Sequence, residues 1–249
     1  MLKCNVSAAS RVGCIRDNNE DMILVGDKFI RDDSLMESLE VDSTKRFIWA
    51  LADGMGGHNS GEVASSDVLH NLQFFFSDIP VGLQVENFNE TIYEWLMSMN
   101  NILDAKGRVD PTLRDMGTTL VVFALYENNF YWMNCGDSRL YRFRNGKLEQ
   151  LTTDHSLSNL LGEGGHSNVI TNCVGGGCDT SFIDIVQCTS EVKIGDVFLL
   201  CSDGLSDMVS DSTIEQLLCD GADASALCDE AENAGGLDNV SAMLITVGL

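Results

Sequence analysis

Four aspartates stand at the ends of apolar runs in this 249-residue sequence. They are Asp53 after residues 47–52, Asp137 after residues 130–136, Asp203 after residues 197–202 and Asp238 before residues 240–247. Neighbouring antiparallel strands begin and end at the same edge of a sheet, so these carboxylates can converge. Ionised carboxylates that meet need a cation between them, unless one of them takes up a proton. Oxygen ligands without histidine or thiolate neighbours favour magnesium or manganese over zinc.

Glycines beside two of these acids fit the same interpretation. Gly54 follows Asp53 and Gly204 follows Asp203. Glycine lets the main chain turn tightly, so that a carbonyl can share the ion bound by the neighbouring acid. Any single Asp-Gly pair is also a common turn, but the four positions together favour a metal centre. The glycine-rich loop after Asp53 is not a P-loop, because the closing Lys-Ser/Thr is missing.

Strands must carry these acids, and the apolar and alternating runs predict where the strands lie. The predicted strands are residues 4–9, 22–25, 47–52, 118–126, 130–134, 140–143, 197–201 and 240–247. Asn145-Gly146, just after the sixth of these, is typical of a two-residue hairpin turn.

Helices are predicted in the intervals between the strands. The first begins near Asn59, which can cap the helix together with Glu62, and its apolar stripe is Val68, Leu72, Phe75 and Phe76. The second repeats apolar residues at helical spacing, namely Ile92, Leu96, Met99 and Leu103. Shorter helices are expected at residues 212–218 and 224–231. Hairpin-linked strands with paired helices predict an α+β fold of antiparallel sheets covered by helices.

Composition limits the class of protein. The chain is 44% hydrophobic, has only two prolines and shows no linker or repeat, so we expect residues 1–249 to form a single domain. The net charge of -23 disfavours nucleic-acid binding, which needs a basic surface. No run approaches the roughly 20 apolar residues of a membrane span, and the N-terminus lacks signal-peptide features. Nine cysteines without a CxxC pair favour a reduced, cytoplasmic protein.

Six motifs, in this order, resemble the type 2C (PPM) family of metal-dependent serine/threonine protein phosphatases, in particular its bacterial branch. They are Gly13-x-x-Arg16-x-x-Asn19-Glu20-Asp21, Ala52-Asp53-Gly54-Met55-Gly56-Gly57-His58, Gly117-Thr118-Thr119, Asn134-Cys135-Gly136-Asp137-Ser138-Arg139, Ser202-Asp203-Gly204 and Asp238-Asn239-Val240-Ser241. The resemblance covers essentially the whole chain. It implies a four-layer αββα sandwich, in which two antiparallel β-sheets are flanked by helix pairs.

The resemblance also implies a role for each site residue. Asp53 would bridge two Mn²⁺ or Mg²⁺ ions. The other metal ligands would be Glu20 and the Gly54 carbonyl on one ion, Asp203 and Asp238 on the second, and Asp137 with Asp203 on a weaker third. Asp21 would hold metal-bound water, and Arg16 would grip the substrate phosphate. Thr118 and Asn239 would support the site.

This arrangement implies a hydrolytic reaction. Two divalent ions roughly 3.5–4 Å apart acidify a bridging water, and the resulting hydroxide attacks phosphorus in line. Arg16 suits phosphate because its planar guanidinium meets two oxygens at once. The expected substrates are phosphoserine and phosphothreonine on proteins, with a cognate Ser/Thr kinase as the opposing enzyme, and we expect a monomer.

Two departures from the family pattern bear on mechanism and specificity. Met55 stands where many eukaryotic members carry a histidine that can protonate the leaving group. The nearby His58 is not expected to replace it, so a metal-bound water would serve. The flap, about residues 154–175, is short and glycine-rich, which leaves substrate preference open, including phosphotyrosine. We expect His155 and His166 to belong to this flap and not to the metal site.

Two other functions remain compatible with the sequence. One is a catalytically silent module that binds phosphoproteins, and the other is a phosphatase for small metabolites. The complete set of acids favours turnover over silent binding, because silent relatives usually lack one or more ligands.

Overall fold

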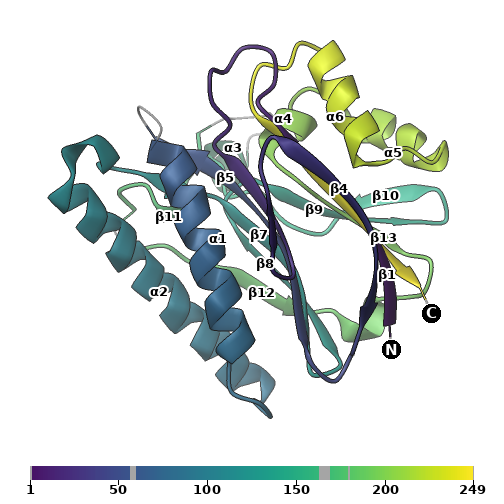
Figure 1. Cartoon of the computed structure of the whole chain (residues 1–249), viewed down its shortest axis with the longest axis horizontal. Coiled ribbons are helices and arrows are strands. Elements are labelled where there is room, and N and C mark those ends of the chain that lie inside the picture. The colour runs from purple at the N-terminus through teal and green to yellow at the C-terminus, as the bar shows by residue number, and fades with distance from the viewer. Residues whose placement is uncertain (1, 57–59, 163–168, 179, 249) are drawn as a thin grey trace.

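The computed structural model describes residues 2–56, 60–162, 169–178 and 180–248. Two antiparallel sheets lie face to face between groups of helices (Figure 1). This arrangement confirms the expected α+β sandwich of two sheets flanked by helices.

One sheet has six strands, and both chain termini lie in it. In spatial order these are β10 (Lys147–Gln150), β9 (Arg139–Arg144), β13 (Val197–Cys201), β14 (Val240–Gly248), β1 (Leu2–Arg11) and β4 (Asp33–Val41). All neighbouring pairs are antiparallel.

The second sheet has eight strands. Its main path runs through β11 (Val174–Gly175), β6 (Gly117–Thr118), β5 (Arg46–Met55), β7 (Leu120–Tyr126), β8 (Asn129–Cys135) and β12 (Asp184–Gln187). Off this path, β2 (Asp21–Val25) pairs with β5, and β3 (Lys28–Ile30) pairs with β2.

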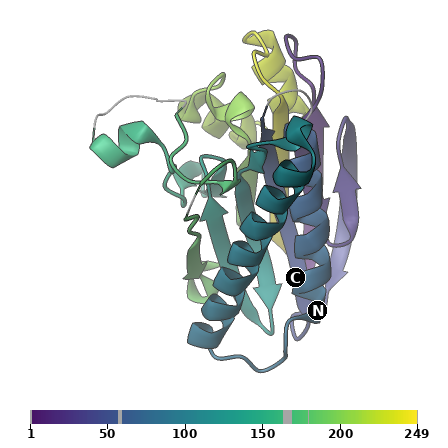
Figure 2. The ribbon, with the colours of Figure 1, turned by 90° about the vertical axis from the view of Figure 1, so that its left-hand side faces the viewer.

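The helices cover the outer faces of both sheets. The long helices α1 (Ser60–Asp78) and α2 (Val85–Val109) lie on the eight-stranded sheet, and α5 (Asp211–Cys219) and α6 (Ala224–Asn233) lie on the six-stranded sheet. Three shorter pieces are α4 (Asp203–Ser206) and the 3₁₀ turns Pro111–Leu113 and Thr189–Glu191. In Figure 2, α3 (Leu157–Leu161) projects away from the sheets.

Strand β5 shows how the core leads to the functional site. Its side chains alternate between faces, so Trp49 and Leu51 pack against the other sheet while Ala50 and Ala52 pack against the helices. Burial on both faces explains the continuous apolar run in the sequence. The first acid after that run, Asp53, is therefore held at the end of a rigid central strand.

Most sequence expectations for the elements are confirmed. Asn145 and Gly146 both have positive φ, 52° and 74°, as a two-residue turn between β9 and β10 requires. The predicted strand at 118–126 is wrong in one detail, because it is two strands interrupted at Thr119. The cap proposed at Asn59 lies outside the described residues, and α1 begins at Ser60.

The sequence missed β3, which pairs with β2, and β4, which pairs with β1 in the other sheet. Strand β4 lies at the edge of its sheet and alternates exposed and half-buried residues, with Glu37 and Glu40 among them. Such a polar edge strand lacks the apolar run by which buried strands are found.

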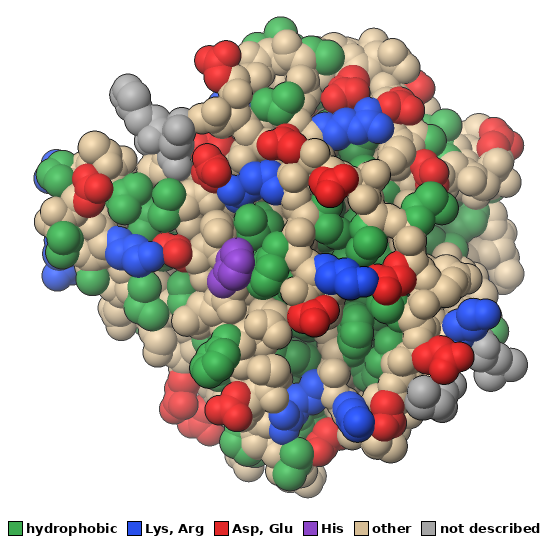
Figure 3. Space-filling model, in the orientation of Figure 1, with side chains coloured by type: hydrophobic (Ala, Val, Ile, Leu, Met, Phe, Trp, Pro, Cys, Tyr) green, Lys and Arg blue, Asp and Glu red, His purple; other side chains and the backbone are tan. Residues whose placement is uncertain are grey.

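Three surface and chemical features complete the fold. On the face seen in Figure 3, acidic side chains are scattered among hydrophobic, polar and basic ones rather than gathered in one patch. All nine cysteines are free thiols. Within the described part of the chain, no helix is both long and apolar enough to cross a membrane.

Candidate metal centre

The pairing of β2 with β5 brings the first two acids together. Asp21 opens β2 and lies directly opposite Asp53 in the register of the two strands. Asp21 is fully buried, whereas Asp53 is partly exposed. Two carboxylates from neighbouring strands therefore share one edge of the eight-stranded sheet.

The six-stranded sheet supplies the next acid. Asp203 follows the end of β13 and opens α4, and its carboxyl group is in hydrogen-bonding contact with that of Asp53. The hydroxyl of Ser202 donates to Asp21 Oδ2 at 2.8 Å. These contacts join the two sheets at the site, as antiparallel topology predicts for acids at strand ends.

Asp238 and Asn239 close the site from the start of β14. Asp238 forms an ion pair with Arg16, with 2.6 Å between Asp238 Oδ2 and the Arg16 guanidinium. Asn239 Oδ1 accepts from the Glu20 N–H at 2.9 Å, and its Nδ2 donates to the carbonyls of Val12 and Asn18. Asn239 therefore holds the loop that carries Arg16 and Glu20, so it positions these residues through the backbone.

Thr118 and Thr119 hold the backbone of Asp53. The Thr118 hydroxyl donates to the Asp53 carbonyl at 2.8 Å, and the Asp53 N–H donates to Thr119 Oγ1 at 3.0 Å. Thr119 also shares a 2.7 Å hydrogen bond with Ser138, the neighbour of Asp137. The sequence selected Thr118 alone, although the Gly-Thr-Thr motif contains both threonines.

The Glu20 side chain contacts the N-terminal end of α1. The Glu20 carboxylate accepts the N–H groups of Gly61 and Glu62, which are free for this because the first N–H groups of a helix have no partner inside it. A Cβ on Gly54 would lie 2.1 Å from the Gly61 carbonyl oxygen. Only glycine permits this close approach between the Asp53 loop and α1.

We call Glu20, Asp21, Asp53, Asp137, Asp203 and Asp238 the acid cluster. Burial, together with the charges of acidic neighbours, raises the pKa of Asp21 to about 7 and that of Asp203 to about 6. The pKa of Asp53 is also raised, first by burial and then by Asp21, Asp203, Asp137 and Asp238. Asp21, Asp53 and Asp203 are thus destabilised in their ionised forms by their surroundings.

Some carboxyl oxygens of the acid cluster have no protein group in the described ranges that offsets this negative charge. Among the described residues, Asp21 Oδ1 and Asp137 Oδ1 are buried without a hydrogen-bond partner. Burial and the Asp203 charge raise the pKa of Asp137 to about 7. Oxygen-only donors with unused lone pairs fit hard divalent cations, although no three acidic, histidine or cysteine side chains of the described segments form a ready coordination shell.

Arg16 is the cation of the site that faces solvent. Its side chain is about half exposed and makes its ion pair with Asp238 at the surface. Nearby acids raise the pKa of its guanidinium, Asp238 first through a hydrogen bond. An exposed guanidinium beside the acid cluster can meet an incoming phosphate without losing its link to the site.

His155 lies at the base of the flap, as expected, but it also reaches toward Asp137. Its Nδ1 accepts from the Gly136 N–H at 3.1 Å and lies 2.8 Å from Asn172 Nδ2. Its Nε2 can then donate to Asp184 Oδ2, 3.0 Å away. His155 therefore fixes the residue before Asp137, a link that the sequence missed. His58 and His166 lie outside the described residues.

Solved structures with the same architecture are serine/threonine phosphatases. The Streptococcus agalactiae enzyme superposes with a TM-score of 0.79 at 25% identity and covers 98% of this chain and 99% of its own. The catalytic domain of PstP, solved with two manganese ions, gives a TM-score of 0.73 at 30% identity with full coverage of both chains. The fold and the acid cluster thus define a class, the metal-dependent phosphatases built on a helix-covered β-sandwich.

Sequence comparisons identify the family. The protein phosphatase 2C model matches residues 26–234. PstP of Mycobacterium tuberculosis is 32% identical over 97% of this chain and 44% of its own length. PhpP of Streptococcus pneumoniae is 33% identical over 97% of both. The chain belongs to the protein phosphatase 2C family, and it spans less than half the length of PstP.

Proposed function

We propose that this chain is a divalent-metal-dependent phosphatase that hydrolyses phosphoserine and phosphothreonine on proteins. The observation that carries the proposal is the acid cluster, where Asp21, Asp53 and Asp203 meet from two sheets and where Asp21 Oδ1 and Asp137 Oδ1 are buried without a partner among the residues that the structure describes. The names of the relatives, serine/threonine protein phosphatases, support the same reaction.

In the proposal, Glu20, Asp53, the Gly54 carbonyl, Asp203 and Asp238 hold two core cations, and Asp137 with Asp203 holds a weaker third. Either Mn²⁺ or Mg²⁺ suits these oxygen donors. When bound, such ions offset the charge of the acids and lower the pKa of a coordinated water, so that a nucleophile forms near neutral pH.

The chain's own groups then orient the phosphate. Arg16 is free to bind two phosphoryl oxygens because its side chain reaches the surface. Its neighbour Asp238 keeps the guanidinium turned toward the acid cluster at 2.6 Å. Asp21 is buried at the register position opposite Asp53, where its carboxyl group can accept a proton from the attacking water.

Met55 cannot protonate the leaving group. Met55 ends β5, and a thioether carries no proton to donate. His155 is buried and engaged by Gly136, Asn172 and Asp184, so it is not available as a general acid either. We therefore assign proton donation to water at the site.

The cellular setting belongs to the same proposal. We propose that the chain forms one catalytic domain over residues 1–249 and acts as a monomer in the cytoplasm on phosphoproteins, opposing a Ser/Thr kinase. The scattered acidic surface (Figure 3) agrees with a protein that stays in solution.

Hydrolysis of phosphoserine and phosphothreonine peptides over a titration of Mn²⁺ and of Mg²⁺ tests the proposal. We expect metal-dependent turnover that falls by at least about 100-fold in Asp203→Asn, because a ligand and its charge are lost. The matched control is Asp220→Asn, an exposed acid at the end of α5, which should keep wild-type rates. Tight phosphopeptide binding without turnover in either metal would support the silent-module alternative instead.

A further inference from the structure

Two thiols lie next to each other where the flap returns to the body of the protein. The Sγ atoms of Cys173 and Cys178 are 3.5 Å apart. Cys173 is 3% exposed, while Cys178 is partly exposed. This separation exceeds a disulfide bond of about 2.05 Å by about 1.5 Å, so a small movement would allow the sulfurs to bond.

The turn between the cysteines explains why they meet. Gly175, Gly176 and Gly177 all have positive φ, at 78°, 64° and 72°, which only glycine adopts at little cost. This curl returns the chain on itself, and the Cys178 N–H donates to the Gly175 carbonyl at 3.1 Å. Three successive glycines also leave the turn free to adjust by the distance that the sulfurs must travel.

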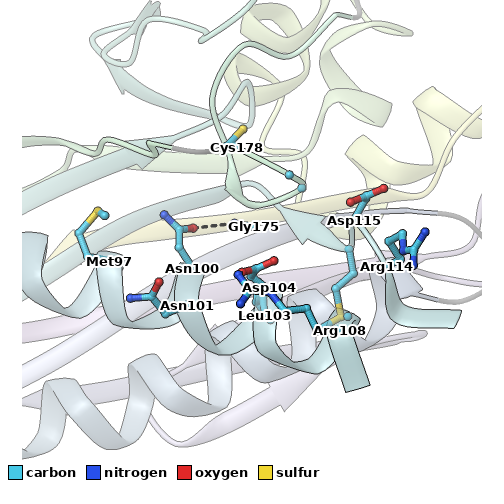
Figure 4. A pocket seen from close by; sticks show the side chains of 14 residues that line it. Met97, Asn100, Asn101, Leu103, Asp104, Arg108, Arg114, Asp115, Gly175 and Cys178 are labelled. Atoms are coloured by element: carbon cyan, nitrogen blue, oxygen red, sulfur yellow. Dashed lines mark hydrogen bonds and ion pairs between the residues drawn. The ribbon is translucent and has the colours of Figure 1, made fainter. Parts of the chain in front are cut away.

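Solvent reaches this turn through a pocket of about 470 Å³ between it and the end of α2. Figure 4 shows Cys178 at the turn, across from Asn100, Asp104 and Arg108 of α2. The pocket is wide enough for a peroxide molecule, and its polar walls keep it wet. Because Cys178 is partly exposed and Cys173 is buried, Cys178 is the thiol that a dissolved oxidant meets first.

The two thiols suit different steps of a disulfide reaction. Burial raises the pKa of Cys173 well above its usual range, so Cys173 remains a thiol at neutral pH and is a poor first nucleophile. Its position against Cys178 makes it suitable as the resolving group, because exchange needs contact between the sulfurs.

We propose that Cys173 and Cys178 form a peroxide-sensitive dithiol that closes to a reversible disulfide. The Cys178 thiolate attacks hydrogen peroxide, the O–O bond breaks, and a sulfenic acid and hydroxide form. The Cys173 sulfur then attacks the sulfenic sulfur, its proton leaves with the departing oxygen, and water is released. Overall, two thiols and one peroxide give one disulfide and two waters. In a cytoplasmic protein such a bond is expected to be transient.

The test uses the whole reduced protein and hydrogen peroxide as the oxidant. After treatment, accessible thiols are blocked under denaturing conditions with N-ethylmaleimide, and peptides are weighed by mass spectrometry. We expect the peptide or peptides that contain Cys173 and Cys178 to carry no N-ethylmaleimide on either residue and to have a mass lower by two hydrogens, as a disulfide requires. After reduction, both residues should react with N-ethylmaleimide again. The remaining cysteines should stay blocked in both samples.

Two variants make the test specific. Cys178→Ser should leave Cys173 fully blocked after peroxide, whereas Cys219→Ser, the loss of an exposed cysteine at the end of α5, should leave the bond unchanged. The proposal is wrong if peroxide oxidises Cys178 without consuming Cys173. A bond from Cys178 to Cys135, a buried thiol whose pKa is raised in part by Cys173 and Cys178, would overturn it equally.

Discussion

The acid cluster and the flap border the same end of the sandwich, but their backbones are held in different ways. Asp21 and Asp53 are paired in the ladder of β2 and β5, and Asp203 follows a strand buried along its length. In the flap, α3 has no buried residue. In the described part of the flap, strand-type pairing between the two sides is limited to one isolated bridge, between Ser156 and Ile170, beside the side-chain contact of His155 with Asn172.

The base of the flap is nevertheless fixed. Arg139 donates to both carboxylate oxygens of Asp154, with side chains that are 9% and 14% exposed, and His155 bonds the Gly136 N–H. With this firm base, the unburied helix α3 can vary without disturbing the acids. A substitution should therefore have large effects in the cluster and small effects in α3.

Matched glycine substitutions give the largest contrast. Gly54→Ala places a Cβ 2.1 Å from the Gly61 carbonyl, inside the backbone contact that seats Glu20. We expect a loss of about 3 kcal/mol in the free energy of unfolding and at least about a 100-fold loss of turnover. Gly162→Ala, at the end of α3, meets no atom within 4 Å and costs only its left-handed φ of 66°, about 1 kcal/mol.

Urea unfolding and phosphopeptide hydrolysis measure both variants. If the Gly162 variant lost as much stability or activity as the Gly54 variant, the distinction between a rigid cluster and a loosely held flap would be wrong.

The sequence predicted the elements that carry the acids because buried strands leave long apolar runs. The run at 47–52 and the Asp53 that ends it could be read directly, as could the helix pairs. Acids at strand ends could be expected to converge, and the strand register brings Asp21 opposite Asp53. The partners of each acid depend on that register, which could not be predicted from a single sequence.

Residues that act through the backbone were harder to find. Thr119 contacts the main-chain N–H group of Asp53, and His155 contacts that of Gly136; both partners are distant in sequence. Neither a threonine nor a histidine indicates by its type alone that it makes such a contact. The Cys173–Cys178 contact depends on three left-handed glycines, which a glycine-rich sequence permits but does not specify. The edge strand β4 was missed for a related reason, since Glu37 interrupts the apolar side chains of its inner face, Leu35, Leu39 and Val41.

The charge in the cluster should make metal-free protein less stable as the pH rises. Folding raises the pKa of Asp203 to about 6 and those of Asp21 and Asp137 to about 7, above an unfolded value of roughly 3.9. The folded state therefore binds protons more tightly, so its stability is highest below about pH 4, falls as the pH rises from about 4 to about 7, and changes little from this cause above that. Saturating Mn²⁺ should flatten this dependence, because the acids then stay ionised.

Asp21→Asn tests the cause of this pH effect. Without metal, we expect the variant to be more stable than wild type at pH 8 by on the order of 2 kcal/mol or more, because a buried charge is gone, and about equal only near or below pH 4, where Asp21 is protonated in both states. Thermal unfolding in a chelator across this pH range measures it, with Asp220→Asn as the control. An unchanged pH slope in Asp21→Asn would show that the slope arises elsewhere, for example from the overall charge of -23.

Removing His155, which links the flap to the acid cluster, should have an intermediate effect on stability and on activation by metal. His155→Ala leaves the Gly136 N–H and Asp184 without their partner, at a cost of about 1–3 kcal/mol. We expect weaker Mn²⁺ activation as well, because Asp137 follows Gly136. The control is His70→Ala on the exposed face of α1, which loses its stacking on Phe29, at a cost of about 0.5–1.5 kcal/mol, but should leave Mn²⁺ activation unchanged. Unfolding in urea and a Mn²⁺ titration of activity distinguish the two.

Oxidation of the dithiol should have the smallest effect on activity. The Gly176 N–H donates to the Met116 carbonyl at 2.8 Å, and β11 pairs with β6, where Thr118 holds the Asp53 carbonyl. A disulfide that shifts this turn moves a support of the site but no ligand, so we expect turnover to fall roughly two- to fivefold and to recover with a thiol reductant. The Cys178→Ser variant should keep its turnover after the same peroxide treatment. A fall of equal size in that variant would show that peroxide acts on another side chain, and that the turn between Cys173 and Cys178 is mechanically independent of the acid cluster.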